Sequence, residues 1–173
     1  MARTFRGEGR YKVDAKGRVS IPAEFRRVLQ ERDPRCQRAE APEAFPELVL
    51  VFGDHLDGHV EGYTAEAAAE VDARIAAMPR GHKARKLLEH LFNAQSQTLI
   101  VDETGRIVLS AKIREKLGLS GDAYFKAAGD TFQIWDADRY EATVGANVAE
   151  QLAALPEDFD PMALLDDPNA VAL

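Results

Sequence analysis

The sequence has a single cysteine, Cys36, and no apolar run approaching the roughly 18–20 residues of a membrane-spanning helix. One cysteine excludes an intramolecular disulfide framework and suits a reducing cytoplasm. No apolar segment follows the basic N-terminus, so a secretory signal is not expected. Hydrophobic residues make up 46% of the 173 residues and charged residues 29%, which argues against wholesale disorder. We therefore expect one or two folded domains in a cytoplasmic protein without a membrane partner.

Signatures of catalysis and of metal binding are also missing. The chain has no glycine-rich phosphate loop, no nucleophile elbow and no zinc-finger spacing. The stretch "DHLDGH" places His55 and His59 four residues apart, with Asp54 and Asp57 beside them. It is typical of a turn, however, and no further ligand follows at a matching spacing. We expect no enzyme activity, no metal, no cofactor and no small-molecule substrate.

Charge is distributed unevenly along the chain. Residues 141–173 contain seven acidic residues and no lysine or arginine, whereas residues 1–38 contain eleven basic and five acidic residues, a net +6 in a chain of net charge −7. Charges are screened beyond about 10 Å, so the local field decides whether a polyanion binds. The basic N-terminal part is compatible with nucleic acid, although a solvated charged face is the commoner explanation of such a cluster.

One pattern occurs twice, as "YKVDAKGRVSIP" (residues 11–22) and "TLIVDETGRIVLS" (residues 98–110). Each copy has an alternating apolar segment, an Asp-x-x-Gly-Arg turn, a second alternating segment and a short helix. We infer an internal duplication with an offset of 88 residues (102 − 14). Glycine supplies the backbone freedom that the bend needs. The residues expected to shape the turns are Asp14, Gly17, Asp102 and Gly105.

The remaining pattern predicts an α+β protein. Its expected parts are a first repeat (residues 1–63), connecting helices (64–97), a second repeat (98–140) and a C-terminal helix with an acidic tail (141–173). We expect helices at 22–32 and 111–119, the latter capped by Ser110 and stopped by Gly118. The expected strands are 47–53, 59–64, 123–129 and 131–136, and the further helices are 64–78, 81–95 and 136–155. The insert 32–47 is expected to be a loop, and residues 156–173 a poorly ordered tail.

Basic side chains gather around the first turn. Lys16 and Arg18 project from the bend, Lys12 precedes it on the strand, and Arg6 lies further ahead. Such a loop can place guanidinium groups on phosphates, and arginine can also bond to guanine edges. An ion pair with Asp14 is the alternative role for Arg18, and both roles stay open here.

Two other sets of side chains have plain structural explanations. For Arg26 and Arg27 on the first predicted helix, a solvated face is at least as good an explanation as ligand contact. Tyr63 and Trp135 end equivalent strands, where core packing is expected rather than stacking on a base.

The stretches "FRGEGRYKVDAKGRVSIPAEFRRVL" and "ARKLLEHLFNAQSQTLIVDETGRIVLSAKIREKLGL" resemble the MraZ family of bacterial transcriptional regulators. The resemblance covers about residues 5–140, and the two tandem turns are its most specific part. It implies that each repeat is a SpoVT-AbrB-like half, and that the halves combine into a swapped-hairpin β-barrel with flanking helices. It also implies a homo-oligomeric ring that binds direct repeats of double-stranded DNA. These repeats would lie in the regulator's own promoter, upstream of the division and cell-wall gene cluster.

Carried over residue by residue, the family's basic turn maps onto Lys16 and Arg18, and the matching arginine of the second copy is Arg106. Thr104 stands where the first copy has Lys16, so the second turn is expected to contribute less to DNA contact than the first. Such a regulator would be associated with the nucleoid. Two alternatives remain: an AbrB-type antitoxin or transition-state regulator acting through a protein partner, and a ring-forming scaffold that does not bind DNA.

Overall fold

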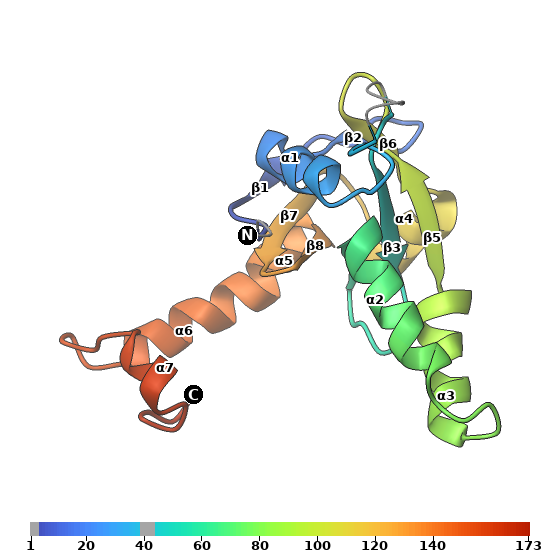
Figure 1. Ribbon diagram of the computed structural model, residues 1–173. Coiled ribbons are helices and arrows are strands. Elements are labelled where there is room, and N and C mark those ends of the chain that lie inside the picture. Colours follow the sequence, from blue (N-terminus) through green and yellow to red (C-terminus); the bar gives the residue numbers. More distant parts are fainter. Residues whose placement is uncertain (1–3, 39–43) are drawn as a thin grey trace. The chain divides into compact units, whose positions relative to one another are not determined.

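The computed structural model describes residues 4–38 and 44–173, so that part of the predicted loop 32–47 lies outside the described residues. The chain divides into a first unit that ends at Ala137 and a second unit, Asp138–Leu173 (Figure 1). The strands are β1 (Glu8–Tyr11), β2 (Arg18–Ser20), β3 (Glu47–Val51), β4 (His59–Thr64), β5 (Ser96–Ile100), β6 (Arg106–Val108), β7 (Ala123–Ala128) and β8 (Thr131–Asp136). The helices are α1 (Ala23–Glu31), α2 (Ala65–Ala76), α3 (Lys83–Leu88), the π-helical η1 (Glu89–Ala94), α4 (Ala111–Leu117), α5 (Ala137–Tyr140), the π-helical η2 (Glu141–Gly145), α6 (Ala146–Ala154) and α7 (Ala163–Asp166).

The two copies exchange strands. The first strand of copy one, β1, pairs with β7 of copy two, and the first strand of copy two, β5, pairs with β3 of copy one. Six antiparallel strands thus form one sheet in the order β1-β7-β8-β4-β3-β5, and β2 and β6 form a separate two-stranded ribbon. The α+β class is confirmed. The six-stranded sheet is open, with β1 and β5 at its edges, and the strand pairs of the described residues do not close it into a barrel.

The short helix after each ribbon strand covers the core in the same way. α1 buries Phe25, Val28 and Leu29, and α4 buries Ile113 and Leu117. The predicted caps of α4 are present: the backbone N–H of Ile113 donates to the Ser110 hydroxyl, and Gly118 ends the helix with a left-handed φ of +61°. The apolar spacing of the helices therefore predicts which faces are buried.

An aromatic cluster fills the core of the first unit. Phe5 packs edge-on against Phe25 and Phe132, with ring centroids 5.2 and 5.0 Å apart, and Phe125 stacks on Phe132 at 6.0 Å. These rings come from the N-terminal segment, α1, β7 and β8, so the cluster joins both copies. Such aromatic pairs stabilise a core by more than the area they bury.

Several details differ from the sequence-based expectation. The predicted helix 81–95 consists of α3 and η1, and the predicted helix 136–155 consists of α5, η2 and α6. Trp135 is buried, as expected, but Tyr63 is only half-buried, and its hydroxyl donates to Glu61 at 2.8 Å.

Within residues 4–38 and 44–173 no group of His, Cys, Asp or Glu could hold a metal ion. No helix in the described part of the chain is both long and apolar enough to span a membrane.

The C-terminal segment 156–173 holds turns and the short helix α7, and none of its residues is buried. Deleting residues 156–173 is therefore expected to leave the far-UV circular dichroism of the fold intact. The melting temperature should change by no more than about 3 °C, since the effect of an unburied segment on stability is small. The measurement belongs at high salt, where association between copies through charge is screened. A larger drop would show that the segment packs on the folded chain.

Candidate nucleic-acid interface

The β2–β6 ribbon joins the strands that follow the two Asp-x-x-Gly-Arg turns. Its register pairs Arg18 with Val108, Val19 with Ile107, and Ser20 with Arg106. Val19 and Ile107 are 1% exposed and anchor the ribbon in the core. Side chains alternate between the two faces of a strand, so the residues on either side of these anchors point outward. We call this set the outer ribbon face: Arg18, Ser20, Arg106 and Val108.

Arg18 and Arg106 are diagonal neighbours on the outer ribbon face. Because Arg18 lies opposite Val108, Arg106 is two residues along from the directly opposed position. The Cβ atoms of such diagonal pairs are about 7–8 Å apart, within reach of long side chains. The strand pairing therefore places the two arginines of the repeat side by side, although they are 88 residues apart in the chain.

Asp14 organises the first turn and orients Arg18. Its carboxylate accepts the backbone N–H groups of Lys16 and Arg18, both at 2.9 Å, and the Arg18 Nε–H at 2.6 Å. The backbone N–H of Arg18 and its guanidinium lower the pKa of Asp14, which stays ionised at neutral pH. The Arg18 side chain is 39% exposed, and its Nη groups make no hydrogen bond with the described residues. The ion pair and ligand contact are thus compatible, because the pair uses one edge of the guanidinium and leaves the other available.

The second turn has the same backbone design with different chemistry. Asp102 accepts the backbone N–H groups of Thr104 at 2.8 Å and of Arg106 at 2.9 Å. These bonds, together with the Thr104 hydroxyl at 2.7 Å, lower the pKa of Asp102 to about 2. The Arg106 Nε–H is further away, 3.3 Å from the carboxylate. The Thr104 side chain therefore serves the turn itself, whereas Lys16 at the same position of the first turn is an exposed cation.

The turn glycines also join the copies. Gly17 and Gly105 have φ of +83° and +78°, where a side chain is strained. The Gly17 carbonyl accepts the N–H of Leu109 at 2.8 Å, and the Gly105 carbonyl accepts the N–H of Ile21 at 2.9 Å. A Cβ on Gly17 would overlap the carbonyl oxygen of Leu109. Each turn is therefore held by a strand of the other copy.

A helix arginine of each copy packs over the turn of the other. The Arg26 guanidinium lies against Gly105, where a Cβ would be 2.7 Å from Arg26 Cζ. The equivalent residue, Arg114, lies against Gly17, and its Nη1 is 3.5 Å from the carbonyl oxygen of Ala15. The two Nε atoms are buried and have no hydrogen-bond partner among the described residues. Arg26 is thus not part of a solvated face, because it crosses to the second copy.

The other proposed contacts are divided between two places. Val13 bridges to Val19, so Lys12 points to the same side as Arg18, and it is exposed. Arg6 lies elsewhere, in a shallow hollow that it lines with Pro22, Ala23 and Glu24 at the start of α1. Arg27 on α1 is paired with Glu24, and both side chains are largely exposed.

The two halves of this surface differ in charge. Residues 12–18 carry three cations and one acid, net +2, whereas residues 100–106 carry one cation and two acids, net −1. Where copy one has Lys12 and Ser20, copy two exposes Ile100 (57%) and Val108 (53%). The field that would attract a polyanion therefore comes from the first turn.

Comparison with known proteins bears on this arrangement. The family model described as "MraZ protein, putative antitoxin-like" matches residues 91–158. The transcriptional regulator MraZ of Ruegeria sp. (strain TM1040) is 55% identical over 166 residues, which cover 96% of this chain and 97% of that one. The proteins of the same name from Cereibacter sphaeroides (strain ATCC 17025) and Acetivibrio thermocellus are 41% and 29% identical, over 96% and 87% of this chain and 98% of each relative. At 55% identity over nearly the full length of both proteins, the chain belongs to the MraZ family of transcriptional regulators.

Proposed function

We propose that the protein regulates transcription by binding double-stranded DNA through the outer ribbon face, with Lys16 and Arg18 as the leading contacts. The observation that carries this proposal is the Arg18 guanidinium, which Asp14 holds by its Nε edge while its Nη groups remain available. A guanidinium held in this way can bond bidentately to a phosphate or to the O6 and N7 acceptors of guanine. Lys12, Arg106 and, further away, Arg6 would add contacts to phosphates.

A single chain offers too few cations for tight binding. A handful of phosphate contacts gives weak affinity that falls steeply with salt. We therefore include in the proposal the homo-oligomeric ring and the direct DNA repeats that the MraZ resemblance implies. Several copies that meet several repeats raise the effective concentration of each further contact, and affinity rises without any new contact. The strand-exchanged ribbon would be the DNA-binding part of each chain.

The decisive experiment is a gel retardation of the full chain with the DNA upstream of its own gene, repeated over a range of salt concentrations. Specific binding predicts a shifted band that survives excess unrelated DNA. The logarithm of the binding constant should fall linearly with the logarithm of salt. Equal affinity for unrelated DNA would contradict sequence-specific regulation at this promoter.

Arg106→Ala is expected to weaken DNA binding less than Arg18→Ala does. The second turn has net charge −1 and lacks the lysine, so the substitution should remove a single phosphate contact, worth about tenfold in affinity. The midpoint of the retardation titration measures this, with both variants at the same salt concentration. A decrease equal to that of Arg18→Ala would show that both turns contact DNA alike.

The family description favours a second candidate function, that of an antitoxin-like protein acting through a protein partner. In that case the purified chain alone should not retard the promoter DNA specifically, and specific binding should require the partner. Specific retardation by the purified chain would decide for the first function.

A further inference from the structure

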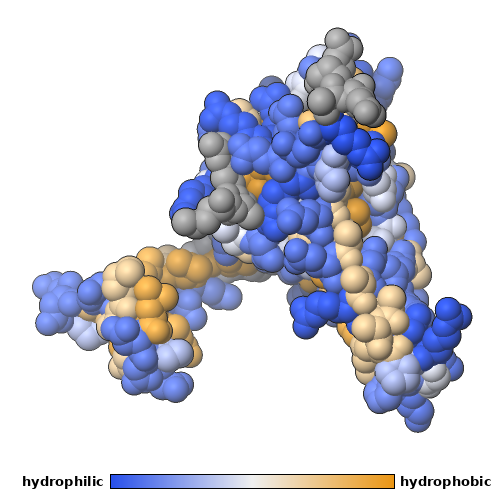
Figure 2. All heavy atoms as spheres, viewed as in Figure 1, coloured by the Kyte–Doolittle hydropathy of each residue, from blue (hydrophilic) through white to orange (hydrophobic). Residues whose placement is uncertain are grey.

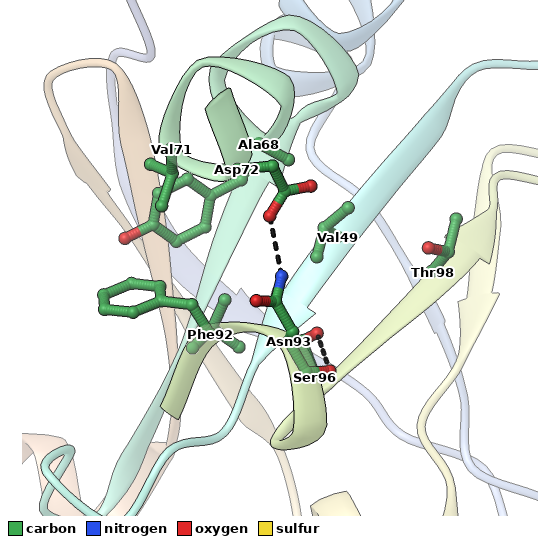
Figure 3. Close-up of a pocket in the computed structure, with 10 residues that line it drawn as sticks. Val49, Ala68, Val71, Asp72, Phe92, Asn93, Ser96 and Thr98 are labelled. Carbon is green, nitrogen blue, oxygen red and sulfur yellow. Dashed lines mark hydrogen bonds between the residues drawn. The ribbon is translucent and has the colours of Figure 1, made fainter. Parts of the chain in front are cut away.

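An apolar groove between α2 and α3 is not used by the proposed DNA contacts. It has a volume of about 410 Å³, and a neighbouring hollow of about 140 Å³ shares three of its side chains. Figure 3 shows the smaller hollow, with Val71 and Phe92 beside the hydrogen bond from Asn93 to Asp72 at 2.7 Å. The residues that line the larger groove are Tyr63, Val71, Arg74, Ile75, Met78, Leu88 and Phe92.

The helices beside the groove have little packing of their own. No residue of α3 or η1 is buried, and Leu87 of α3 is largely exposed. A helix that carries leucine and phenylalanine side chains is stable when its apolar side is covered. This part of the first unit therefore has the character of a docking surface.

The helices α2 and α3 form a hairpin, and its tip, residues 74–88, is strongly basic. Residues 74–88 contain five lysines and arginines and no acid. Arg85 is occupied by Glu89 and by the carbonyls of Ala76 and Met78. The other four form no ion pair with any residue that the structure describes: Arg74, Arg80, Lys83 and Lys86. An apolar groove beside uncompensated positive charge fits an acidic, amphipathic partner.

The second unit of the chain has these properties. Residues 138–173 carry eight acids and one arginine, net −7. No residue of η2 or α6 is buried. An apolar stripe follows this helix at spacings of four, four and three residues, through Val144, Val148, Leu152 and Leu155. Leu152 is 63% exposed, and Figure 2 shows apolar atoms at the surface of the C-terminal helix.

We infer that the C-terminal helix of one protein chain docks, by this stripe, in the apolar groove of a second chain of the same protein. The second unit that carries this helix, net −7 over residues 138–173, then brings negative charge to the basic tip, net +5 over residues 74–88. An amphipathic helix in an apolar groove is a recurrent mode of recognition.

The contact is heterologous, because the groove of one chain binds the helix of the next chain. Contacts of this kind build a closed ring when the rotation between copies closes. The inference rests on the homo-oligomer of the proposed function and supplies its interface. It also gives a role to the acidic C-terminal part, which the DNA contacts leave unexplained.

The first test is the mass of the full chain in solution by light scattering, at several concentrations. Leu152→Asp should raise the dissociation constant between copies at least tenfold, while its melting curve in dilute solution matches that of the wild type. The matched control is Leu165→Asp, which places the same charge at a residue of the same unit that is 74% exposed and lies off the stripe. It should leave the assembly intact. Unchanged assembly in Leu152→Asp, or equal weakening in both variants, would overturn the inference.

The second test mixes two defective variants. Leu152→Asp keeps an intact groove, and Lys83→Glu/Lys86→Glu keeps an intact stripe but lowers the net charge of the tip, residues 74–88, from +5 to +1. Each alone should be mostly a single chain, and their mixture should give a complex of two chains and no more, because neither variant can extend it. A mixture that stays at the mass of one chain would contradict docking between copies. A wild-type chain that is itself monomeric would instead contradict the homo-oligomer in the proposed function and this inference with it, whereas the retardation assay tests the DNA contacts separately.

Discussion

Arg18→Ala is expected to abolish specific retardation of the promoter DNA, with affinity reduced about a hundredfold or more. One good bidentate contact is worth about 1–3 kcal/mol, and it would be missing from every copy of an oligomer that engages the DNA. The fold should survive, because the Arg18–Asp14 pair is an exposed one. Such pairs contribute about 0–1 kcal/mol. Retardation titrations at two salt concentrations measure the decrease, and light scattering checks that the oligomer is intact.

Arg27→Ala is the matched control for that experiment. Arg27 also pairs with a nearby acid, Glu24, but it belongs to α1 and not to the outer ribbon face. It should retain nearly full binding. If Arg18→Ala keeps wild-type affinity for the promoter DNA, Arg18 is not part of the interface. If the affinity falls equally in both variants, Arg18 contributes only its positive charge.

Gly17→Ala is expected to destabilise the fold more than any exposed substitution, by about 2–6 kcal/mol in the free energy of unfolding. The left-handed φ of +83° strains any residue with a Cβ, and the new methyl group would overlap the carbonyl oxygen of Leu109. That oxygen belongs to the backbone of the second repeat of the same chain and cannot move aside without disturbing the ribbon. Urea denaturation at fixed protein concentration measures the change.

Substitutions at two other glycines give losses of stability to compare with that of Gly17→Ala. At Gly105 the backbone is equally left-handed, but the obstacle is the end of the flexible Arg26 side chain, so Gly105→Ala should cost less. At Gly121, which has an ordinary backbone conformation, no atom lies within 4 Å of an added Cβ, and Gly121→Ala should change stability by no more than about 0.5 kcal/mol. Equal effects at Gly17 and Gly121 would mean that the turn adapts to a side chain.

The local features of this fold could be predicted from the sequence because they depend on neighbouring residues. The apolar spacing of α1 and α4, the Ser110 cap and the Gly118 stop are all properties of short segments. The duplication could be found because Asp14, Gly17 and Arg18 recur at one offset. These features fix the elements of each repeat without fixing how the repeats combine.

The exchange of strands could not be predicted from local pattern, since β1 is as compatible with a partner in its own copy as with β7. Only the resemblance to the MraZ family pointed to a swapped arrangement. The position of Arg26, for which a solvated face and ligand contact were both open, could not be predicted for the same reason, because its contact with Gly105 exists only when the two repeats interleave. The outward position of Ile100 and Val108 has the same origin, since strand alternation alone does not say which partner strand covers each face.

The unequal turns of the ribbon have a consequence for how the protein would lie on DNA. Two identical halves related by a twofold axis look the same from both directions, and such dimers recognise palindromes. Here the halves are joined in one chain and have diverged, so one end of the ribbon carries net charge +2 and the other −1. On the proposed function, rotating the chain by half a turn would exchange a strong DNA contact for a weak one. Each DNA-bound subunit would then have one direction along the double helix, and subunits with the same direction would match sites repeated in the same orientation.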